Sequence, residues 1–216
     1  MTRILLAGAS GMVGREVLRQ ALADPRVDEI VAPARRPLTA DAGLHNPLVD
    51  FDALPADAAW WKVDAVICTL GTTIRDAGSQ AAFRKVDHDY PLAVARHALA
   101  HGATTFVLTS ASGADAESRI FYSRTKGELE RDLRALGYRS LCLVRPGLLG
   151  GERERRRPLE HAGMQLLGAI GPLLPRRYRV VPAERVAATL LQMALDAEPG
   201  VHIVESEEIG SGLGSR

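Results

Sequence analysis

Short apolar runs of strand length alternate along this chain with longer amphipathic stretches of helix length. Strands that alternate with helices form a parallel sheet whose two faces are covered by helices, with right-handed crossovers. The pattern therefore predicts a doubly wound α/β fold. The strands are expected at residues 3–7, 29–34, 47–51, 63–70, 104–110, 139–145, 178–181 and 201–204. The helices are expected at residues 12–23, 78–100, 122–136, 159–167 and 182–197.

The length of 216 residues predicts a single domain rather than two full-sized ones. We expect this domain to span residues 1–209, with residues 151–200 as a small substrate-side extension and residues 210–216 as a flexible tail. The chain has 27 basic and 26 acidic residues, a net charge of +1. A nearly neutral chain lacks the general positive field that holds proteins on nucleic acids or membrane surfaces, so we expect neither partner.

Two further features of the sequence bear on the compartment. No apolar run approaches the roughly 18 residues needed to cross a bilayer, and the amino end lacks the pattern of a signal peptide. Cys68 and Cys142 lie within strand-like runs and are interpreted as small core residues of a reduced compartment. We therefore expect a cytoplasmic protein, either a monomer or a homodimer.

The segment Gly8-Ala9-Ser10-Gly11-Met12-Val13-Gly14 joins the first predicted strand to the first predicted helix. In such a turn the first glycine permits the tight bend, the second lets the backbone approach a pyrophosphate, and the third lets the helix pack closely on the sheet. The helix start adds free N–H groups and the positive end of its dipole. This turn predicts dinucleotide binding by Gly8, Ser10, Gly11, Met12, Val13 and Gly14.

The end of the second predicted strand indicates which dinucleotide is bound. An NAD enzyme carries an acidic residue there, which accepts a hydrogen bond from the ribose 2′-hydroxyl. This chain has no carboxylate at that point but carries Arg35 and Arg36, and guanidinium groups suit a 2′-phosphate. We therefore predict NADP(H) rather than NAD(H). Asp50 or Asp52 is expected to meet the adenine amino group, and Asp50 and Phe51 are counted with the cofactor-binding residues.

Tyr122 and Lys126 stand four positions apart at the start of a predicted helix and therefore share one helical face. The ordinary pKa of a tyrosine is about 10, so proton transfer near neutrality requires a neighbouring positive charge that lowers it. Lysine is informative here, because the chain has only three lysines among its cationic residues. Ser110, at the end of the preceding predicted strand, is expected to orient a substrate carbonyl, with Ser112 as the alternative.

The ordered set of glycine turn, serine-bearing strand end and Tyr-x-x-x-Lys resembles the short-chain dehydrogenase/reductase superfamily. The finer pattern is similar to its atypical, Tat-interacting-protein-like branch. The segments that carry this likeness are Leu70-Gly71-Thr72-Thr73, Val86-Asp87-His88-Asp89-Tyr90, Ser112-Gly113-Ala114-Asp115, Lys126-Gly127-Glu128 and Arg145-Pro146-Gly147-Leu148-Leu149-Gly150. One departure stands out: where relatives carry a pair of serines, this chain has Ser110-Ala111.

The resemblance implies a Rossmann fold, NADPH bound across the strand ends, and hydride transfer to a small carbonyl substrate. By that similarity Tyr122 is the proton donor, and Lys126 holds the cofactor ribose. The remaining residues implied to line the cofactor are Leu70, Gly71 and Thr72 along its ribose and phosphates, and Pro146, Gly147 and Leu148 beside its nicotinamide.

Two other functions compete with this one. A sugar-nucleotide epimerase uses the same triad but commonly needs a larger carboxyl-terminal domain than the roughly 70 residues that follow Arg145. A non-catalytic NADPH-binding redox sensor or interaction module is the alternative of another class, since a fold does not fix a function. We expect no metal site, because Asp87, His88 and Asp89 are adjacent within a predicted helix and their side chains should diverge.

Overall fold

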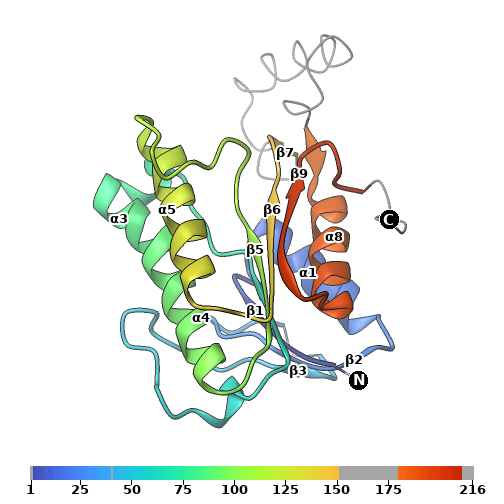
Figure 1. Cartoon of the computed structure of the whole chain (residues 1–216). Coiled ribbons are helices and arrows are strands. Elements are labelled where there is room, and N and C mark those ends of the chain that lie inside the picture. The colour runs from blue at the N-terminus through green and yellow to red at the C-terminus, as the bar shows by residue number, and fades with distance from the viewer. Residues whose placement is uncertain (1, 40, 151–179, 211–216) are drawn as a thin grey trace.

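The computed structural model describes residues 2–39, 41–150 and 180–210. Its main sheet has seven parallel strands in the order β3-β2-β1-β4-β5-β6-β9, which confirms the Rossmann-type doubly wound fold. The central strands are apolar and buried, as expected where helices cover both faces (Figure 1). The strands are β1 (Thr2–Ala7), β2 (Val27–Val31), β3 (Leu44–His45), β4 (Ala65–Cys68), β5 (Thr105–Thr109), β6 (Ser140–Arg145) and β9 (Gly200–Glu205).

The chain order reverses between β1 and β4, because β1 pairs with β2 on one side and with β4 on the other. At such a switch point the loops after the two strands part and leave a crevice at the carboxyl ends of the strands. The turn after β1 and the loop after β4 therefore lie next to each other. This edge of the sheet is where a ligand is expected.

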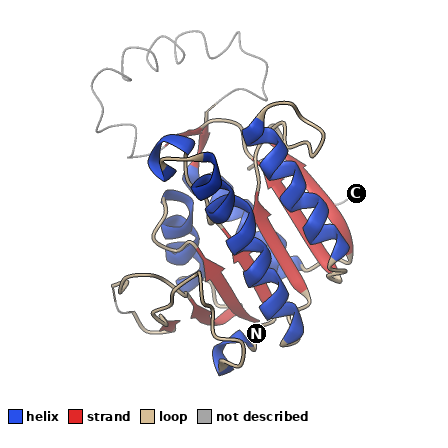
Figure 2. Cartoon of the chain, turned by 90° about the vertical axis from the view of Figure 1, so that its left-hand side faces the viewer, coloured by secondary structure: helices blue, strands red, loops and turns tan. Residues whose placement is uncertain are grey.

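Two layers of helices cover the sheet (Figures 1 and 2). Helix α1 (Met12–Leu22) packs against α8 (Ala183–Asp196), and both bury apolar residues against one face of the sheet. Helices α4 (Tyr90–Ala100) and α5 (Phe121–Ala135) cover the other face. Both cysteines are free and buried in these cores, as the sequence predicted.

The helix predicted at residues 78–100 is helical over residues 80–100 in the structure, with a π-helical turn inside it. The chain forms two short helices, α2 (Ile74–Ala77) and α3 (Gln80–Arg84), then a π-helical turn η2 (Lys85–Asp89) that leads into α4. Gly78 ends α2 in the left-handed conformation, with φ of +80°, and the Ser79 hydroxyl accepts a hydrogen bond that begins α3. Apolar periodicity indicated neither α2, none of whose residues is buried, nor the π-helical turn.

The strand predicted at residues 47–51 is also displaced. Strand β3 comprises Leu44–His45, and only a single bridge between Ala34 and Leu48 continues the pairing. The chain turns away because Asp50 accepts a hydrogen bond from the Asp52 N–H, and the Phe51 side chain enters the core. A short 3-10 helix, η1 (Ala59–Trp61), follows before β4.

The later part of the chain completes the sheet. Strands β7 (Leu149–Gly150) and β8 (Val181–Pro182) form a separate parallel pair, and α8 then leads to β9 at the edge of the main sheet. In the range assigned to a substrate-side extension, α8 thus belongs to the helical layer that also holds α1. The helix predicted at residues 159–167 lies outside the described residues.

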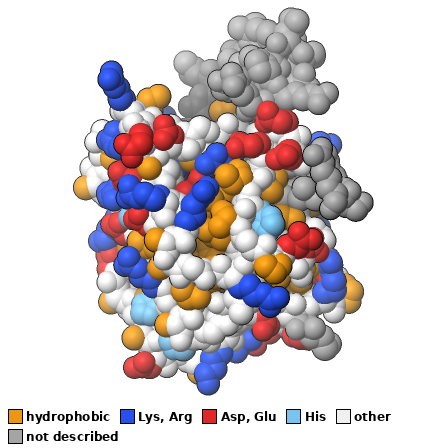
Figure 3. Space-filling model, viewed as in Figure 1, with side chains coloured by type: hydrophobic (Ala, Val, Ile, Leu, Met, Phe, Trp, Pro, Cys, Tyr) orange, Lys and Arg blue, Asp and Glu red, His pale blue; other side chains and the backbone are white. Residues whose placement is uncertain are grey.

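Charged side chains of both signs lie on one face of the molecule. Figure 3 shows acidic and basic side chains mixed over one face, with apolar side chains gathered towards its centre. On the edge strand β9 the side chains of Val201 and Ile203 are 50% and 40% exposed. Among the described residues, no helix is both long and apolar enough to cross a membrane.

Candidate cofactor and active site

The turn after β1 can be built only with glycine at two of its positions. Gly8 has φ of +93°, and a Cβ atom there would lie 2.7 Å from Thr69 Oγ1 at the end of β4. A Cβ atom on Gly14 would lie 2.1 Å from the Gly8 carbonyl oxygen, so α1 could not approach the turn. At Gly11 the same distance is 3.2 Å, which a small shift would relieve. Gly8 and Gly14 therefore have steric reasons of their own, apart from any ligand.

The start of α1 faces the crevice with its backbone donors available. Gly11 is the N-cap residue, no described side chain caps the helix, and the first turn holds no acidic residue. The first N–H groups of an α-helix lack partners within the helix, so those of Met12 and Val13 can receive an anion. Ser10 is exposed beside them. This arrangement fits the pyrophosphate of a dinucleotide.

The segment after β2 carries the two arginines predicted to read a 2′-phosphate. Arg35 and Arg36 are exposed, and neither has a carboxylate partner within the part of the chain that the structure describes. Asp50 is exposed, whereas the Phe51 side chain is buried and packs on Tyr90, with ring centroids 5.5 Å apart. The Phe51 side chain is therefore not open to a ligand.

Asp52, the alternative to Asp50 as the adenine contact, is held by other side chains. Its carboxylate accepts hydrogen bonds from Lys85 and from the Tyr90 hydroxyl, each at 2.8 Å. The hydrogen bond from Lys85, followed by that from Tyr90, lowers the pKa of Asp52. The structure therefore favours Asp50 as the carboxylate that is open to a ligand.

Tyr122 and Lys126 occupy the first two turns of α5 but differ in burial. The Tyr122 side chain is 38% exposed, its ring packs on Phe83, and its hydroxyl has no hydrogen-bond partner among the described residues. Lys126 is buried, and its Nζ lies 2.7 Å from Asp87 Oδ1. Burial acts to lower the pKa of Lys126, but Asp87 and then Tyr122 act against it, and the net effect raises this pKa. Lys126 is therefore held as an ammonium.

Asp87 also ties Lys126 to the loop after β4. Asp87 Oδ2 accepts a hydrogen bond of 2.8 Å from the backbone N–H of Thr72. Next to Thr72, a Cβ atom on Gly71 would lie 3.4 Å from Asp87 Oδ1 and 3.8 Å from Lys126 Nζ. The loop of Leu70, Gly71 and Thr72 thus lies directly against the ion pair, in the crevice between β1 and β4.

Ser110 does not face the crevice as a free hydroxyl. It is 5% exposed, and its hydroxyl donates a 2.5 Å hydrogen bond to Glu130 Oε1. Glu130 also accepts bidentate hydrogen bonds from Arg145, from Nε at 2.9 Å and from Nη2 at 2.6 Å. A hydroxyl hydrogen given to Glu130 is not available to a substrate carbonyl, so the structure disfavours the role predicted for Ser110. Its place is in a buried network that joins β5, α5 and β6.

Ser112, the alternative hydroxyl, lies on the same edge as the loop after β6. It is half-buried, and its N–H donates to the Pro146 carbonyl at 2.9 Å. In that loop Pro146 is buried, Gly147 donates its N–H to Ser206 Oγ at 3.0 Å, and Leu148 is 50% exposed. The segment predicted to flank a nicotinamide is therefore fixed to the loop that carries Ser112.

Sequence reasoning gave no functional role to Asp87. It expected the side chains of Asp87, His88 and Asp89 to diverge, which is correct for Asp87 but wrong for the other two. His88 Nδ1 lies 2.8 Å from Asp89 Oδ1, and His88 Nε2 lies 3.1 Å from Asp132 Oδ2. The sequence offered no clear signal, because Asp87 stands among other charged residues, and its partner on α5 could not be inferred from them.

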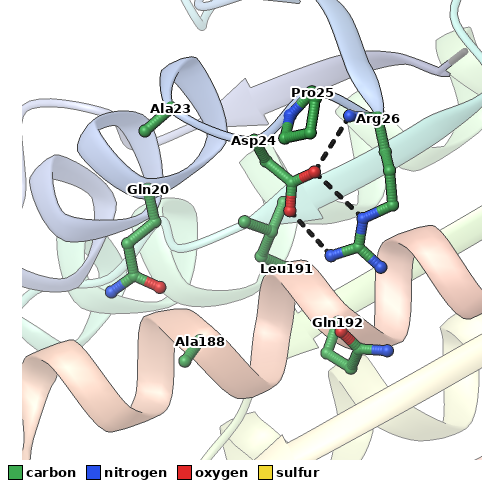
Figure 4. Close-up of a pocket in the computed structure, with 8 residues that line it drawn as sticks. All are labelled: Gln20, Ala23, Asp24, Pro25, Arg26, Ala188, Leu191 and Gln192. Carbon is green, nitrogen blue, oxygen red and sulfur yellow. Dashed lines mark hydrogen bonds and ion pairs between the residues drawn. The ribbon is translucent and has the colours of Figure 1, made fainter.

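A separate depression of about 310 Å³ lies at the opposite edge of the sheet. Figure 4 shows that it is formed between the end of α1, the segment before β2 and α8, with Asp24 and Arg26 paired beside it. None of the predicted site residues lines it. The candidate site is therefore the crevice at the carboxyl ends of the strands.

Comparison with known proteins identifies the family to which the chain is similar. Residues 8–197 match the model of an NAD(P)H-binding family. The chain is 36% identical over 181 residues to "Protein fmp52, mitochondrial" of Emericella nidulans, which covers 79% of this chain and 77% of that one. It is 32% identical over 211 residues to "Protein HTATIP2" of Rattus norvegicus, which covers 95% and 87%.

Solved structures share the fold at low sequence identity. A short chain dehydrogenase family protein from Francisella tularensis superposes with a TM-score of 0.67 at 12% identity, over 96% of this chain and 98% of that chain. MoeE5 in complex with UDP-glucose and NAD gives a TM-score of 0.71 at 17% identity, over 97% and 80%.

Proposed function

The chain belongs to the atypical, NAD(P)H-binding branch of the short-chain dehydrogenases/reductases, and from that premise we propose that it is an NADPH-dependent oxidoreductase that reduces a small carbonyl substrate. One observation carries the proposal. A buried ammonium, Lys126, lies against the Gly71–Thr72 backbone, one helical turn from the exposed phenol of Tyr122. An ammonium has three N–H donors, and that of Lys126 has one partner, Asp87, among the described residues.

The residues that would hold the cofactor follow from the crevice. The N–H groups at the start of α1 receive the pyrophosphate, Arg35 and Arg36 receive the 2′-phosphate, and the remaining donors of Lys126 bind ribose hydroxyls. A bound NADPH supplies the hydride. We infer NADP(H) rather than NAD(H) from the exposed arginines after β2 and from the absence of an acidic residue in residues 32–36.

The chain's own part in the reaction is the movement of a proton. Tyr122 donates its phenolic proton to the carbonyl oxygen of the substrate, and the nearby ammonium stabilises the phenolate that remains. Ser112 replaces Ser110 as the hydroxyl that orients this oxygen. Exposed apolar side chains, Ile74, Ile120 and Leu148, lie on segments that follow β4, β5 and β6. They favour a carbonyl compound with an apolar body.

The first test removes the phenolic hydroxyl in Tyr122→Phe and follows NADPH oxidation with a panel of aldehydes, ketones and quinones. General acid catalysis contributes about 10²- to 10⁴-fold, so turnover should fall by that factor while NADPH binding is kept. Tyr138→Phe is the matched control, because it removes a buried hydroxyl that donates to the Ala95 carbonyl, away from the crevice. Undiminished oxidation in Tyr122→Phe would overturn the assignment. NADPH binding without turnover on any substrate would favour the redox sensor or interaction module.

The second test concerns the choice of dinucleotide. Calorimetry on the unaltered protein should give NADPH at least about tenfold tighter binding than NADH, and Arg35→Glu should abolish the difference by placing a carboxylate against the phosphate. Arg134→Glu makes the same charge change in the last turn of α5 and should leave the ratio as it is. Equal affinities that Arg35→Glu leaves unchanged would refute the preference for NADP(H).

A further inference from the structure

We propose that Asp87 is a positioning residue for the cofactor. It holds the Lys126 ammonium in place against the Gly71–Thr72 loop and so determines how tightly the chain binds the cofactor ribose. This rests on the proposed function only in taking NADP(H) as the ligand of Lys126. Both side chains are almost completely buried, with 5% of Lys126 and 1% of Asp87 exposed. Few ionic groups are buried without a structural or functional reason.

The carboxylate serves two partners with its two oxygens. Oδ1 faces the Lys126 ammonium, while Oδ2 accepts the backbone N–H of Thr72. A single side chain from the second helical layer thus fixes both the cation on α5 and the loop after β4. The exposed Gly71 lies between these contacts and the crevice. Any displacement of Asp87 would move both the cation and the loop.

The backbone around Asp87 explains how an acidic residue reaches this position. The π-helical turn η2 lies between α3 and α4 and packs beside α5. Within it Asp87 and His88 are buried, while Asp89 is exposed. A π-turn adds a residue to the helix and shifts the side chains that follow, and such turns occur frequently at functional sites. Here it turns Asp87 towards α5.

The charges of the Asp87–Lys126 pair distinguish a positioning role of Asp87 from a role in packing alone. In a buried site the neutral amine is favoured, because burial penalises charge. The Asp87 carboxylate opposes this effect, so the lysine stays protonated with donors left over for a ligand. Asp87→Asn keeps the shape and a carbonyl oxygen for the Thr72 N–H but removes the charge. In that variant the pKa of Lys126 should fall, because burial is no longer opposed.

The test is NADPH affinity as a function of pH, from about pH 7 to about pH 9.5. In the unaltered protein the pKa of Lys126 is raised above its ordinary value, so affinity should be nearly constant over this range. In Asp87→Asn affinity should fall at least about tenfold as pH rises, because the amine loses its proton. Asp89→Asn is the matched control, since it removes the same charge from the same turn without touching Lys126, and its profile should stay flat.

A second experiment measures the titration of the Lys126 ammonium directly. The chain has three lysines, Lys62, Lys85 and Lys126, so nuclear magnetic resonance of lysine labelled at Nζ gives a spectrum that can be assigned by single substitutions. Titration of the Lys126 signal should move to lower pH in Asp87→Asn. If the unaltered protein fails to bind NADPH, the proposed function is wrong, but this titration still decides whether Asp87 holds the ammonium.

The proposal is overturned if Asp87→Asn leaves both the Lys126 titration and the NADPH profile unchanged. If Asp87→Asn fails to fold, Asp87→Glu replaces it. That variant keeps the charge but displaces the ammonium, so it should weaken NADPH binding at least about tenfold without a new pH dependence. Binding as tight as in the unaltered protein would then refute the positioning role.

Discussion

Helix α5 carries two ion pairs one turn apart, each with its α5 side chain buried, and they differ in the hydrogen-bonding groups that they leave without a partner. Lys126 faces Asp87 of the turn η2, and Glu130 faces Arg145 of β6. The Glu130 carboxylate receives two hydrogen bonds from Arg145 and a third from Ser110. Lys126 has three donors and one described partner. The Glu130 carboxylate thus has its hydrogen-bond donors within the protein, whereas the Lys126 ammonium keeps unused N–H donors at the edge of the crevice.

The difference separates a structural network from a ligand-binding one. A buried carboxylate is tolerated when its oxygens are all bonded, and Glu130 meets that condition while joining β5, α5 and β6. A buried ammonium with donors to spare is incomplete until something occupies them. The Gly71–Thr72 loop lies against that ammonium. Burial alone would not distinguish the two α5 residues, since the side chains of Glu130 and Lys126 are 4% and 5% exposed.

The largest expected effect is on the free energy of unfolding, and it comes from breaking the pair of Glu130 and Arg145. Glu130→Gln removes the buried carboxylate partner of the Arg145 guanidinium, which keeps only the exposed Glu205, so the free energy of unfolding should fall by about 3 kcal/mol. NADPH affinity of the folded variant should stay within about twofold of the unaltered protein, because the crevice is untouched. Urea unfolding and calorimetry measure the two quantities.

Glu128→Gln is the control for that variant. Glu128 is on the same helix and pairs with Arg84, but the pair is more exposed, so its loss should change stability much less. A Glu130→Gln protein of normal stability that bound NADPH tenfold more weakly would contradict the division between the two pairs. It would mean that Glu130 supports the crevice rather than the fold.

Local sequence pattern predicted most of the fold. The periodicity of apolar residues located the strands of the main sheet and the helices that cover it, because each is apolar on the face or faces that it buries. It missed the short helix α2, which buries no residue and is set by local hydrogen bonds at Thr73 and Gly78. The strand predicted at residues 47–51 failed similarly, because a turn at Asp50 ends the pairing.

The candidate site was predictable only where its residues form local motifs. The glycine turn and the spacing of Tyr122 and Lys126 follow from the geometry of one turn and one helix. The pairing of Lys126 with Asp87 joins residues 39 positions apart and depends on the register of a π-turn. The bond from Ser110 to Glu130 likewise depends on how α5 packs against β5. Such long-range contacts leave no periodic signal in a single sequence.

A smaller expected effect concerns the two serines after β5. Ser110 belongs to the buried network of Glu130, whereas we assign Ser112 to the substrate. Ser110→Ala removes one of three hydrogen bonds to Glu130 and should lower the free energy of unfolding by about 1 kcal/mol, with turnover of the stable fraction unchanged. Ser112→Ala should leave stability nearly unchanged and lower turnover about tenfold, because the substrate oxygen loses a donor. NADPH oxidation and urea unfolding of both variants decide the matter. Each alanine variant is the control for the other, and a loss of turnover confined to Ser110→Ala would mean that its hydroxyl leaves Glu130 when substrate binds.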